Sequence, residues 1–357
     1  MSIRRRAKAV IRARQTVEHL TAERPPQEPR ARPLRLHLNE NTVGCAPAVL
    51  RALRRQLSPS QLARYPEYGR GRAALARHFG VKPDELILTN GIDDAIKLIC
   101  DTFVDPGDVL LTPTPTFPMY QFFHALAGGK LSLVRCDARA QLPLPQLLAA
   151  LGGRPRWLAL ANPNNPTGSL LSQLDVRTIL EAAPKTLVLV DEAYFDFSGL
   201  TVLPWINRFP NLVVARTFSK AYGLAGLRLG LLFANRELTG LMRRAHAVFP
   251  VNSLALAAAL VAIRHQEPVR RYAAMVKASR AFLCERLEAM GIRCAPSAAN
   301  FVFARVGDRA PALARHLRSR GILVRDWSAD PVLHPYWRIS VGTRREMERL
   351  LKALQET

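Results

Sequence analysis

From residue 34 onwards, short apolar runs alternate with helical stretches, and this alternation restricts the possible folds more than any other feature of the chain. Seven of the runs predict buried strands, at residues 85–89, 108–112, 130–135, 157–160, 187–190, 212–215 and 229–233. The pattern is typical of an α/β fold in which helices cover both faces of a largely parallel sheet. Polar side chains that follow these strands are therefore expected to meet at one edge of the sheet, where α/β proteins bind their ligands.

The chain divides into four predicted parts. Residues 1–33 differ from the rest because arginines crowd their beginning and prolines follow, which predicts a flexible basic extension. After residue 254 the pattern changes to long helices with a few short strands, which predicts a smaller α+β domain. The predicted parts are the basic N-terminal extension (1–33), an N-terminal segment of the small domain (34–64), the large domain (65–254) and the C-terminal small domain (255–357).

Composition narrows the class of protein. No apolar run is long enough to span a membrane, and the five cysteines have no CxxC spacing, which predicts reduced thiols in a cytoplasmic protein without a metal site. The formal charge is +23, and 43 of the 51 basic residues are arginine. The charge has two interpretations, a compositional bias that leaves a solvated basic surface, or attraction of anions such as phosphorylated substrates or nucleic acid. We favour the first as the main cause.

Lys220 lies in the most informative segment, residues 217–228, just after the predicted strand 212–215. A lysine at the end of a buried strand is costly to desolvate unless it has a chemical role. A lysine that loses its proton can form a Schiff base with a carbonyl, which is how proteins hold pyridoxal phosphate. Ser219 and Arg228 are placed to bind a phosphate. Taken alone, the segment also fits a loop with a solvated lysine.

Two further strands end in polar residues that suit the same cofactor. Asp191 ends the predicted strand 187–190, and its carboxylate can pair with a pyridinium nitrogen. Tyr194 and Asn165 are placed to donate to the phenolate oxygen of the ring. Lys220, Asp191 and Asn165 all follow strands, so the predicted topology brings them to the same edge of the sheet.

Together these segments resemble the fold-type-I, pyridoxal-phosphate-dependent aminotransferases of class I and II, and within them the histidinol-phosphate aminotransferases. The resemblance runs from about residue 34 to the C-terminus, and its motifs lie at 38–41, 64–67, 89–91, 115–120, 164–168, 191–194, 219–220, 325 and 338–343. It implies a fold-type-I transferase with a large, mostly parallel sheet and a smaller α+β domain. It also implies pyridoxal 5′-phosphate as cofactor, and transfer of an amino group between histidinol phosphate and 2-oxoglutarate in histidine biosynthesis.

The resemblance also implies a role for each matching residue. The catalytic residues would be Lys220, Asp191 and Tyr194. The cofactor would further contact Gly91, Ile92, Asp93, Phe117, Asn165, Thr217, Ser219 and Arg228, and Tyr65 from the neighbouring subunit of a homodimer. The substrate would be bound by Arg338, Arg325 and Asn41. No metal is expected, and the expected partners are a small amino donor, a keto acid and a second copy of the chain.

Two departures from the family pattern concern the substrate. Thr42 and Val43 stand where the family has proline and tyrosine, and Trp327 follows Arg325 where smaller residues are usual. An indole there would suit an aromatic substrate, so an aromatic amino-acid aminotransferase is the first alternative, followed by threonine-phosphate decarboxylase. A more distant alternative is a regulator that uses this fold as a sensor and binds nucleic acid through its basic arm. Residues 1–33 are too short for a winged helix, so nucleic acid is not expected as a partner. A membrane is not expected either, because no apolar run is long enough to span one.

Overall fold

The computed structural model describes residues 13–18, 20, 33–328, 330 and 333–356. Most of the predicted basic extension, residues 1–12, 19 and 21–32, lies outside the described part. The part of it that is described contains the short helix α1 (Gln15–Glu18), which lies against α6 (Met119–Leu126). There the Arg14 guanidinium donates to the backbone carbonyl of Leu126 at 3.2 Å.

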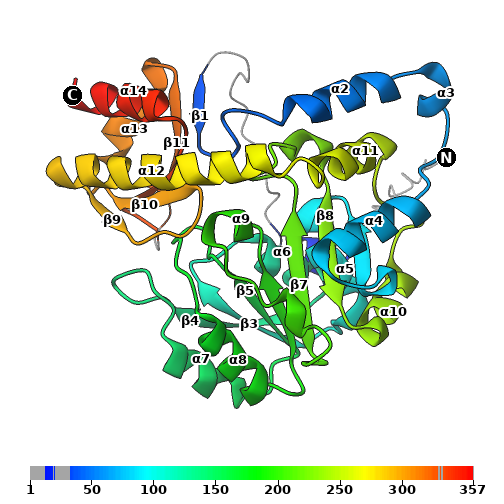
Figure 1. Ribbon diagram of the computed structural model, residues 1–357. Helices are drawn as coiled ribbons and strands as arrows, with labels where there is room; N and C mark the ends of the chain where they lie inside the picture. The colour runs from blue at the N-terminus through cyan, green and yellow to red at the C-terminus, as the bar shows by residue number, and fades with distance from the viewer. Residues whose placement is uncertain (1–12, 19, 21–32, 329, 331–332, 357) are drawn as a thin grey trace, which may run out of the picture.

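The larger of two sheets contains all seven predicted strands, in the order β2-β8-β7-β6-β5-β3-β4 (Figure 1). Their bounds are β2 (Leu86–Thr89), β3 (Val109–Thr114), β4 (Lys130–Arg135), β5 (Trp157–Ala161), β6 (Leu187–Asp191), β7 (Leu212–Thr217) and β8 (Gly230–Ala234). Every neighbouring pair is parallel except those of β8, which runs antiparallel to β2 and β7. The largely parallel sheet predicted from the sequence is therefore confirmed.

The central strands are apolar along their whole length because helices cover both faces of the sheet. Alternate residues enter two different cores, since Leu158 and Val188 pack on one face while Trp157 and Leu189 pack on the other. The first face is covered by α7 (Leu144–Leu151), α8 (Gln173–Ala182) and α11 (Ser253–Ala262). The second is covered by α5 (Gly91–Phe103), α6 and α10 (Arg236–Ala245).

The second sheet has five strands in the order β1-β11-β12-β10-β9. They are β1 (Leu34–Leu36), β9 (Arg293–Ala295), β10 (Phe301–Arg305), β11 (Ile322–Asp326) and β12 (Tyr336–Ser340). The first of them, β1, precedes the strands of the large sheet in the chain and pairs in parallel with β11. Two sheets of unequal size, each with its own helices and core, are the predicted fold class.

One long helix, α12 (Glu267–Ala289), joins the two cores (Figure 1). Its first turns contribute Val269 to the core of the large sheet, and from Tyr272 onwards it packs into the core of the small sheet. The other elements are α2 (Pro47–Gln56), α3 (Pro59–Leu62), α4 (Gly69–Phe79), α9 (Phe195–Ser198), α13 (Ala310–Ser319), α14 (Arg344–Gln355) and the 3₁₀ turns η1 (Pro83–Glu85), η2 (Leu203–Trp205) and η3 (Ala225–Leu227).

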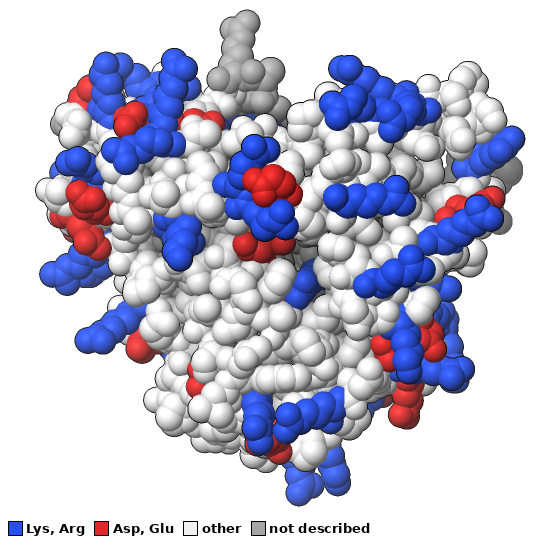
Figure 2. Space-filling view, in the orientation of Figure 1, with Lys and Arg blue, Asp and Glu red and all other residues white. Residues whose placement is uncertain are grey.

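Basic side chains are spread over the face of the molecule that Figure 2 shows. Figure 2 shows Lys and Arg distributed across this face of the molecule, with fewer acidic side chains interspersed. Such a distribution agrees with a solvated basic surface, the favoured interpretation of the charge. Among the described residues, no helix is both long and apolar enough to cross a membrane.

Candidate active site

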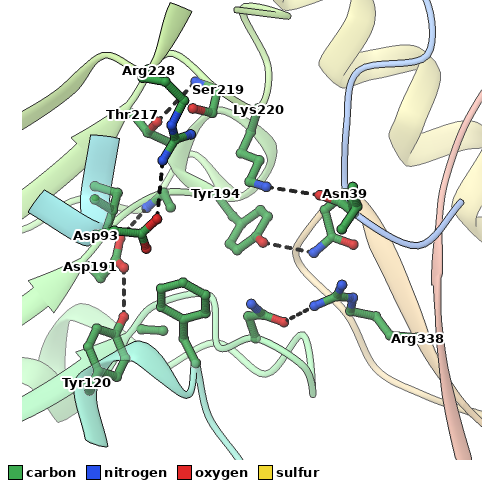
Figure 3. A pocket seen from close by; sticks show the side chains of 16 residues that line it. Asn39, Asp93, Tyr120, Asp191, Tyr194, Thr217, Ser219, Lys220, Arg228 and Arg338 are labelled. Carbon is green, nitrogen blue, oxygen red and sulfur yellow. Dashed lines mark hydrogen bonds and ion pairs between the residues drawn. The ribbon is translucent and has the colours of Figure 1, made fainter. Parts of the chain in front are cut away.

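A cavity of about 250 Å³ lies between the two sheets, at the carboxyl ends of β5, β6 and β7 (Figure 3). Most of the residues predicted to bind cofactor or substrate line it, namely Ile92, Asp93, Phe117, Asn165, Asp191, Tyr194, Thr217, Ser219, Lys220, Arg228 and Arg338. Asn165, Asp191 and Lys220 come together because the parallel strands β5, β6 and β7 end at the same edge of the sheet. Four other predicted residues, Gly91, Tyr65, Arg325 and Asn41, do not line this cavity.

Lys220 lies three residues beyond the end of β7 and extends into the cavity (Figure 3). Its ammonium donates to the backbone carbonyl of Leu38 at 3.2 Å. Burial, and secondarily the nearby positive charge of Arg338, lower the pKa of Lys220 to about 8. A substantial fraction of the side chain is therefore a neutral amine, the nucleophilic form, close to physiological pH.

Asp191, the last residue of β6, is a buried carboxyl on the floor of the cavity. It accepts a hydrogen bond from the Tyr120 hydroxyl at 2.7 Å and another from the backbone N–H of Ala193 at 3.0 Å. Burial raises the pKa of Asp191 to about 6. Within the described part of the chain no cation pairs with it, so the site provides a buried acid that lacks a basic partner.

Tyr120 is a site residue to which the sequence analysis gave no role. It lies in the first turn of α6, three residues after Phe117, and the two rings meet edge to face at 5.6 Å. Its hydroxyl fixes one oxygen of Asp191, so it orients the acid. The spacing of two aromatic residues at i and i+3 across a helix start is the signal that could have identified it.

Tyr194 and Asn165 both present donors to the cavity. The Tyr194 hydroxyl accepts a hydrogen bond from the Asn39 amide at 2.9 Å, so its own proton remains available to an oxygen in the cavity. Burial raises the pKa of Tyr194, which keeps that proton in place. The amide oxygen of Asn165 accepts from the Arg338 guanidinium at 2.6 Å, so the Asn165 NH₂ group is the part that is free to donate.

The segment near residue 40 contributes Asn39 to the cavity, whereas the sequence analysis assigned Asn41. Asn39 has left-handed backbone geometry (φ 55°), and its backbone N–H donates to the Ser340 hydroxyl at 2.8 Å. Asn41 instead donates to the carbonyl of Ala221 at 3.0 Å and accepts from the backbone N–H groups of the next turn. In this structure Asn41 shapes the chain around the cavity.

One end of the cavity combines three features that suit a phosphate. The buried Ser219 hydroxyl has no hydrogen-bond partner among the described residues. Arg228 is close by and forms an ion pair with Asp93 at 3.2 Å (Figure 3). The N-terminus of α5 supplies backbone N–H groups, and Gly91 at its start has φ 81°. A Cβ atom at Gly91 would lie 2.5 Å from the Arg228 guanidinium, so this approach of backbone to side chain requires glycine.

Arg338 lies at the opposite end, on β12 of the small sheet, and is buried. It donates to Asn165 and, at 2.7 Å, to the backbone carbonyl of His37. Burial lowers the pKa of Arg338 to about 10, and within the described residues no carboxylate pairs with it. Arg325 lies directly opposite Arg338 in the β11–β12 register and is exposed. These two cations suit an anionic substrate group.

Tyr65 lies away from the cavity and is 77% exposed. Its ring stacks on Phe249 at 4.4 Å. Leu62 and Val248, which are close to these two residues in the sequence, are also exposed. An aromatic pair on the outside of the subunit is available to a second copy of the chain.

The residues fit pyridoxal phosphate at three independent points. Asp191 is a buried acid without a cation and suits a pyridinium nitrogen, while the orphaned Ser219 hydroxyl suits a phosphate oxygen. Lys220, with its lowered pKa, suits an aldehyde. Phe117 lines the cavity beside them and provides an aromatic face for a planar ring.

The structure has a mostly parallel sheet joined to a smaller α+β domain, with a lysine, an aspartate and an asparagine at the ends of its strands. These features define the fold-type-I transferases. Within this class, a sequence model of the aminotransferases of class I and II matches residues 32–354. The chain belongs to this family, and the family and fold class predicted from the sequence are confirmed.

The chain is similar to several named proteins and solved structures. "Histidinol-phosphate aminotransferase 3" of Rhizobium meliloti (strain 1021) is 36% identical over 335 residues, which cover 90% of this chain and 89% of that protein. A histidinol-phosphate aminotransferase of Symbiobacterium thermophilum is 35% identical over 327 residues, 90% of each chain. The crystal structure of histidinol-phosphate aminotransferase from Sinorhizobium meliloti, in complex with pyridoxal-5′-phosphate, superposes with a TM-score of 0.89, at 30% identity and 98% coverage of both chains.

Proposed function

We propose that this protein is a pyridoxal-phosphate-dependent transaminase that moves an amino group between histidinol phosphate and 2-oxoglutarate, giving imidazole acetol phosphate and glutamate in histidine biosynthesis. The observation that carries the proposal is the meeting, in one cavity, of an amine with a lowered pKa at Lys220 and a buried acid without a cation at Asp191. The names of the relatives support the choice of substrate.

The cofactor is pyridoxal 5′-phosphate, which supplies an aldehyde that condenses with amines and a protonated ring that withdraws electrons from the bond to be broken. Asp191 would hold the proton on the ring nitrogen, and Tyr120 would keep the carboxylate in place. Tyr194 and Asn165 would donate to the phenolate oxygen, Phe117 would cover the ring, and the orphaned Ser219 hydroxyl, Arg228 and the N-terminus of α5 would bind the phosphate.

Lys220 has two tasks in this mechanism. Its neutral amine would hold the cofactor between turnovers. When an amino donor has taken its place, Nζ of the same amine would accept the Cα proton and deliver it two atoms further along, to the carbon of the cofactor that carried the aldehyde. Both tasks need the neutral form, which burial favours by lowering the pKa to about 8. The carbonyl of Leu38, 3.2 Å from Nζ, would hold the displaced amine near the reacting atoms.

Arg338 is the anion-binding residue of the proposed reaction. With glutamate it would hold a carboxylate, since a planar guanidinium matches that group. Histidinol phosphate has no α-carboxylate, and in that half-reaction Arg338 would hold the phosphate. Because Arg338 also fixes Asn165, substrate binding and cofactor binding share one hydrogen-bonded chain.

We further propose a cytoplasmic homodimer in which Tyr65 reaches the cofactor phosphate of the other subunit. Support comes from the exposed Tyr65–Phe249 pair and, for the compartment, from five cysteines that are all free. Mixing two weakened variants, K220A and Y65A, tests the dimer. Heterodimers would carry one complete site, so mixing would restore activity to about a quarter of the sites, whereas independent subunits would restore none.

Separate half-reactions test the substrate. The visible absorption of the bound cofactor is followed while histidinol phosphate, phenylalanine or threonine phosphate is added to the purified holoenzyme. Rapid conversion by histidinol phosphate alone supports the proposal. Preference for phenylalanine would favour the aromatic class, for which Trp327 beside Arg338 is the relevant observation. Release of CO₂ from threonine phosphate would indicate a decarboxylase, and no cofactor absorption at all would contradict the proposal.

A further inference from the structure

The face of the small sheet that looks toward the cavity carries arginines and aromatic rings. Along β10 and β12, alternate residues point to opposite faces, and Val302, Ala304, Trp337 and Ile339 fill the core. The residues between them form the other face, on which Phe303 and Arg325 flank Arg338 in one cross-strand row. This row runs from Arg338, which lines the cavity, to Arg325, which is exposed.

Trp327 lies next to this row and contacts both arginines. The guanidinium carbon of Arg325 lies 5.7 Å from the centroid of the Trp327 ring, and that of Arg338 lies 5.6 Å from it. Both distances fall within the range of cation–π attraction. The indole also meets Phe303 edge to face at 6.2 Å, so it is supported from the sheet.

Asp326 sets the position of the turn that carries Trp327. One oxygen of its carboxylate accepts hydrogen bonds from the backbone N–H of Ser328 at 3.0 Å and from the indole N–H of Trp337 at 3.1 Å. Trp337 is fully buried, so the turn is tied to the core of the small domain. The place of the Trp327 indole is therefore built into the fold.

The two guanidiniums need such support because they repel each other. Like charges directly opposite each other on neighbouring antiparallel strands are destabilising. Within the described residues neither Arg325 nor Arg338 forms an ion pair with a carboxylate, and the Nε atom of Arg338 is buried without a hydrogen-bond partner. The indole attracts each cation and leaves its positive charge in place, whereas an acidic residue at this position would have neutralised the charge.

We propose that Trp327 sets the charge preference of the substrate site by holding Arg325 beside Arg338, so that the two cations act together on a doubly charged phosphate. A carboxylate carries one charge and needs Arg338 alone, which its hydrogen bonds to Asn165 and His37 hold independently of Trp327. Trp327 is thus a positioning residue for the phosphate substrate. The inference rests on the proposed function for its natural ligand, though the charge preference is a property of these three side chains.

The test compares the W327L and W327F holoenzymes in the two half-reactions. Leucine keeps apolar bulk but removes the cation–π face, so W327L is expected to lower kcat/KM for histidinol phosphate about tenfold and for glutamate less than about threefold. W327F keeps an aromatic face and is expected to recover most of the loss. W205F, a change at a tryptophan of η2 outside the cavity lining, serves as the matched control and is expected to leave both values unchanged.

A double-mutant cycle separates positioning from general damage to the domain. R325Q is expected to reproduce the selective loss of W327L, and the double variant W327L/R325Q is expected to be no worse than either single variant, because both changes remove the same contribution. Additive losses, or equal losses for histidinol phosphate and glutamate, would overturn the proposal.

Equilibrium binding keeps this inference distinct from the proposed function. Butyl phosphate and pentanoate share an alkyl chain and differ in the charge of the head group, and at pH 8 the phosphate is a dianion. W327L is expected to raise the Kd of butyl phosphate about tenfold and that of pentanoate less than threefold, measured by calorimetry on the holoenzyme. This selectivity would stand even if histidinol phosphate were not turned over, and its absence would refute the role of Trp327 alone.

Discussion

The two walls of the cavity differ in how their functional side chains are held. On the large sheet, Asp191 is fixed by Tyr120 and by a backbone N–H group, at the end of a strand that is buried on both faces. On the small sheet, Arg325 is exposed and is held by an aromatic contact to Trp327. Short hydrogen bonds in a buried setting fix geometry more strictly than cation–π contacts of an exposed side chain. We infer that the large sheet fixes the chemistry and the small sheet adjusts the substrate.

This comparison predicts that the largest loss follows a change at Lys220. K220A removes both the bond to the cofactor and the general base, and the expected loss in kcat is roughly ten-thousand-fold or more. K220R should be no better, because a guanidinium does not lose its proton. Steady-state rates provide the measurement, and K185A, at an exposed lysine of the same domain, is the control. An active K220A enzyme would remove the basis of the proposed mechanism.

D191N is expected to have the next largest effect, a loss in kcat of about a thousandfold. An amide of the same size leaves the packing intact but no longer carries the negative charge that holds a proton on the ring nitrogen. The folded state should be preserved or stabilised, because a buried carboxyl without a cation is itself costly. Thermal unfolding of the apoenzyme and single-turnover rates of the holoenzyme check the two parts separately. If D191N kept nearly full activity, the large sheet would not fix the chemistry.

R338Q probes the anchor of the small sheet and is expected to raise the KM for glutamate about a hundredfold. The variant loses a buried, charge-assisted hydrogen bond to the carboxylate. Because Arg338 also fixes Asn165, a smaller fall in kcat should accompany the change in KM. A fall in kcat with KM unchanged would mean that Arg338 acts through the cofactor and does not contribute to substrate binding.

Y120F should have the smallest effect of the four, about tenfold in kcat/KM at neutral pH. The hydrogen bond from Tyr120 lowers the pKa of Asp191, which burial otherwise raises, so its loss moves that pKa further up. Asp191 works as a carboxylate, and its activity is therefore lost as the pH falls through this pKa. The acidic limb of the pH–rate profile should shift to higher pH in Y120F. An unchanged limb would show that the cofactor alone controls the ionisation of Asp191.

Much of the cavity wall that the large sheet forms could be predicted, because the residues that specify it are neighbours in the sequence. Each apolar run marks a strand, and the polar residue after it marks the edge where parallel strands end, so Asn165, Asp191 and Lys220 follow from three short segments. The observed strands differ from the predicted ones by at most two residues at an end; β7, for example, continues to Thr217. The family motifs then add a cofactor to a site that the pattern had already located.

The choice between Asn39 and Asn41 is not local, because both are asparagines in the same turn-rich segment. Asn39 faces the cavity because its backbone N–H is bound by Ser340, 301 residues away, and because its left-handed geometry directs the amide to Tyr194. Tyr120 likewise acquires its role only when α6 packs beside the end of β6. Such contacts depend on how segments pack, which no periodicity within either segment specifies.

The sequence by itself determined the positions of the strands along the chain, the class of fold and the positions of the lysine, aspartate and asparagine, because burial and turn chemistry are imprinted on neighbouring residues. Only the tertiary structure brings Arg325 and Arg338 face to face. Arg325 and Arg338 are 13 residues apart, and they stand opposite each other because of the β11–β12 register. A register shift of one residue would direct one of them to the other face of the sheet. That register, together with the turn that presents Trp327, is a property of the folded small domain.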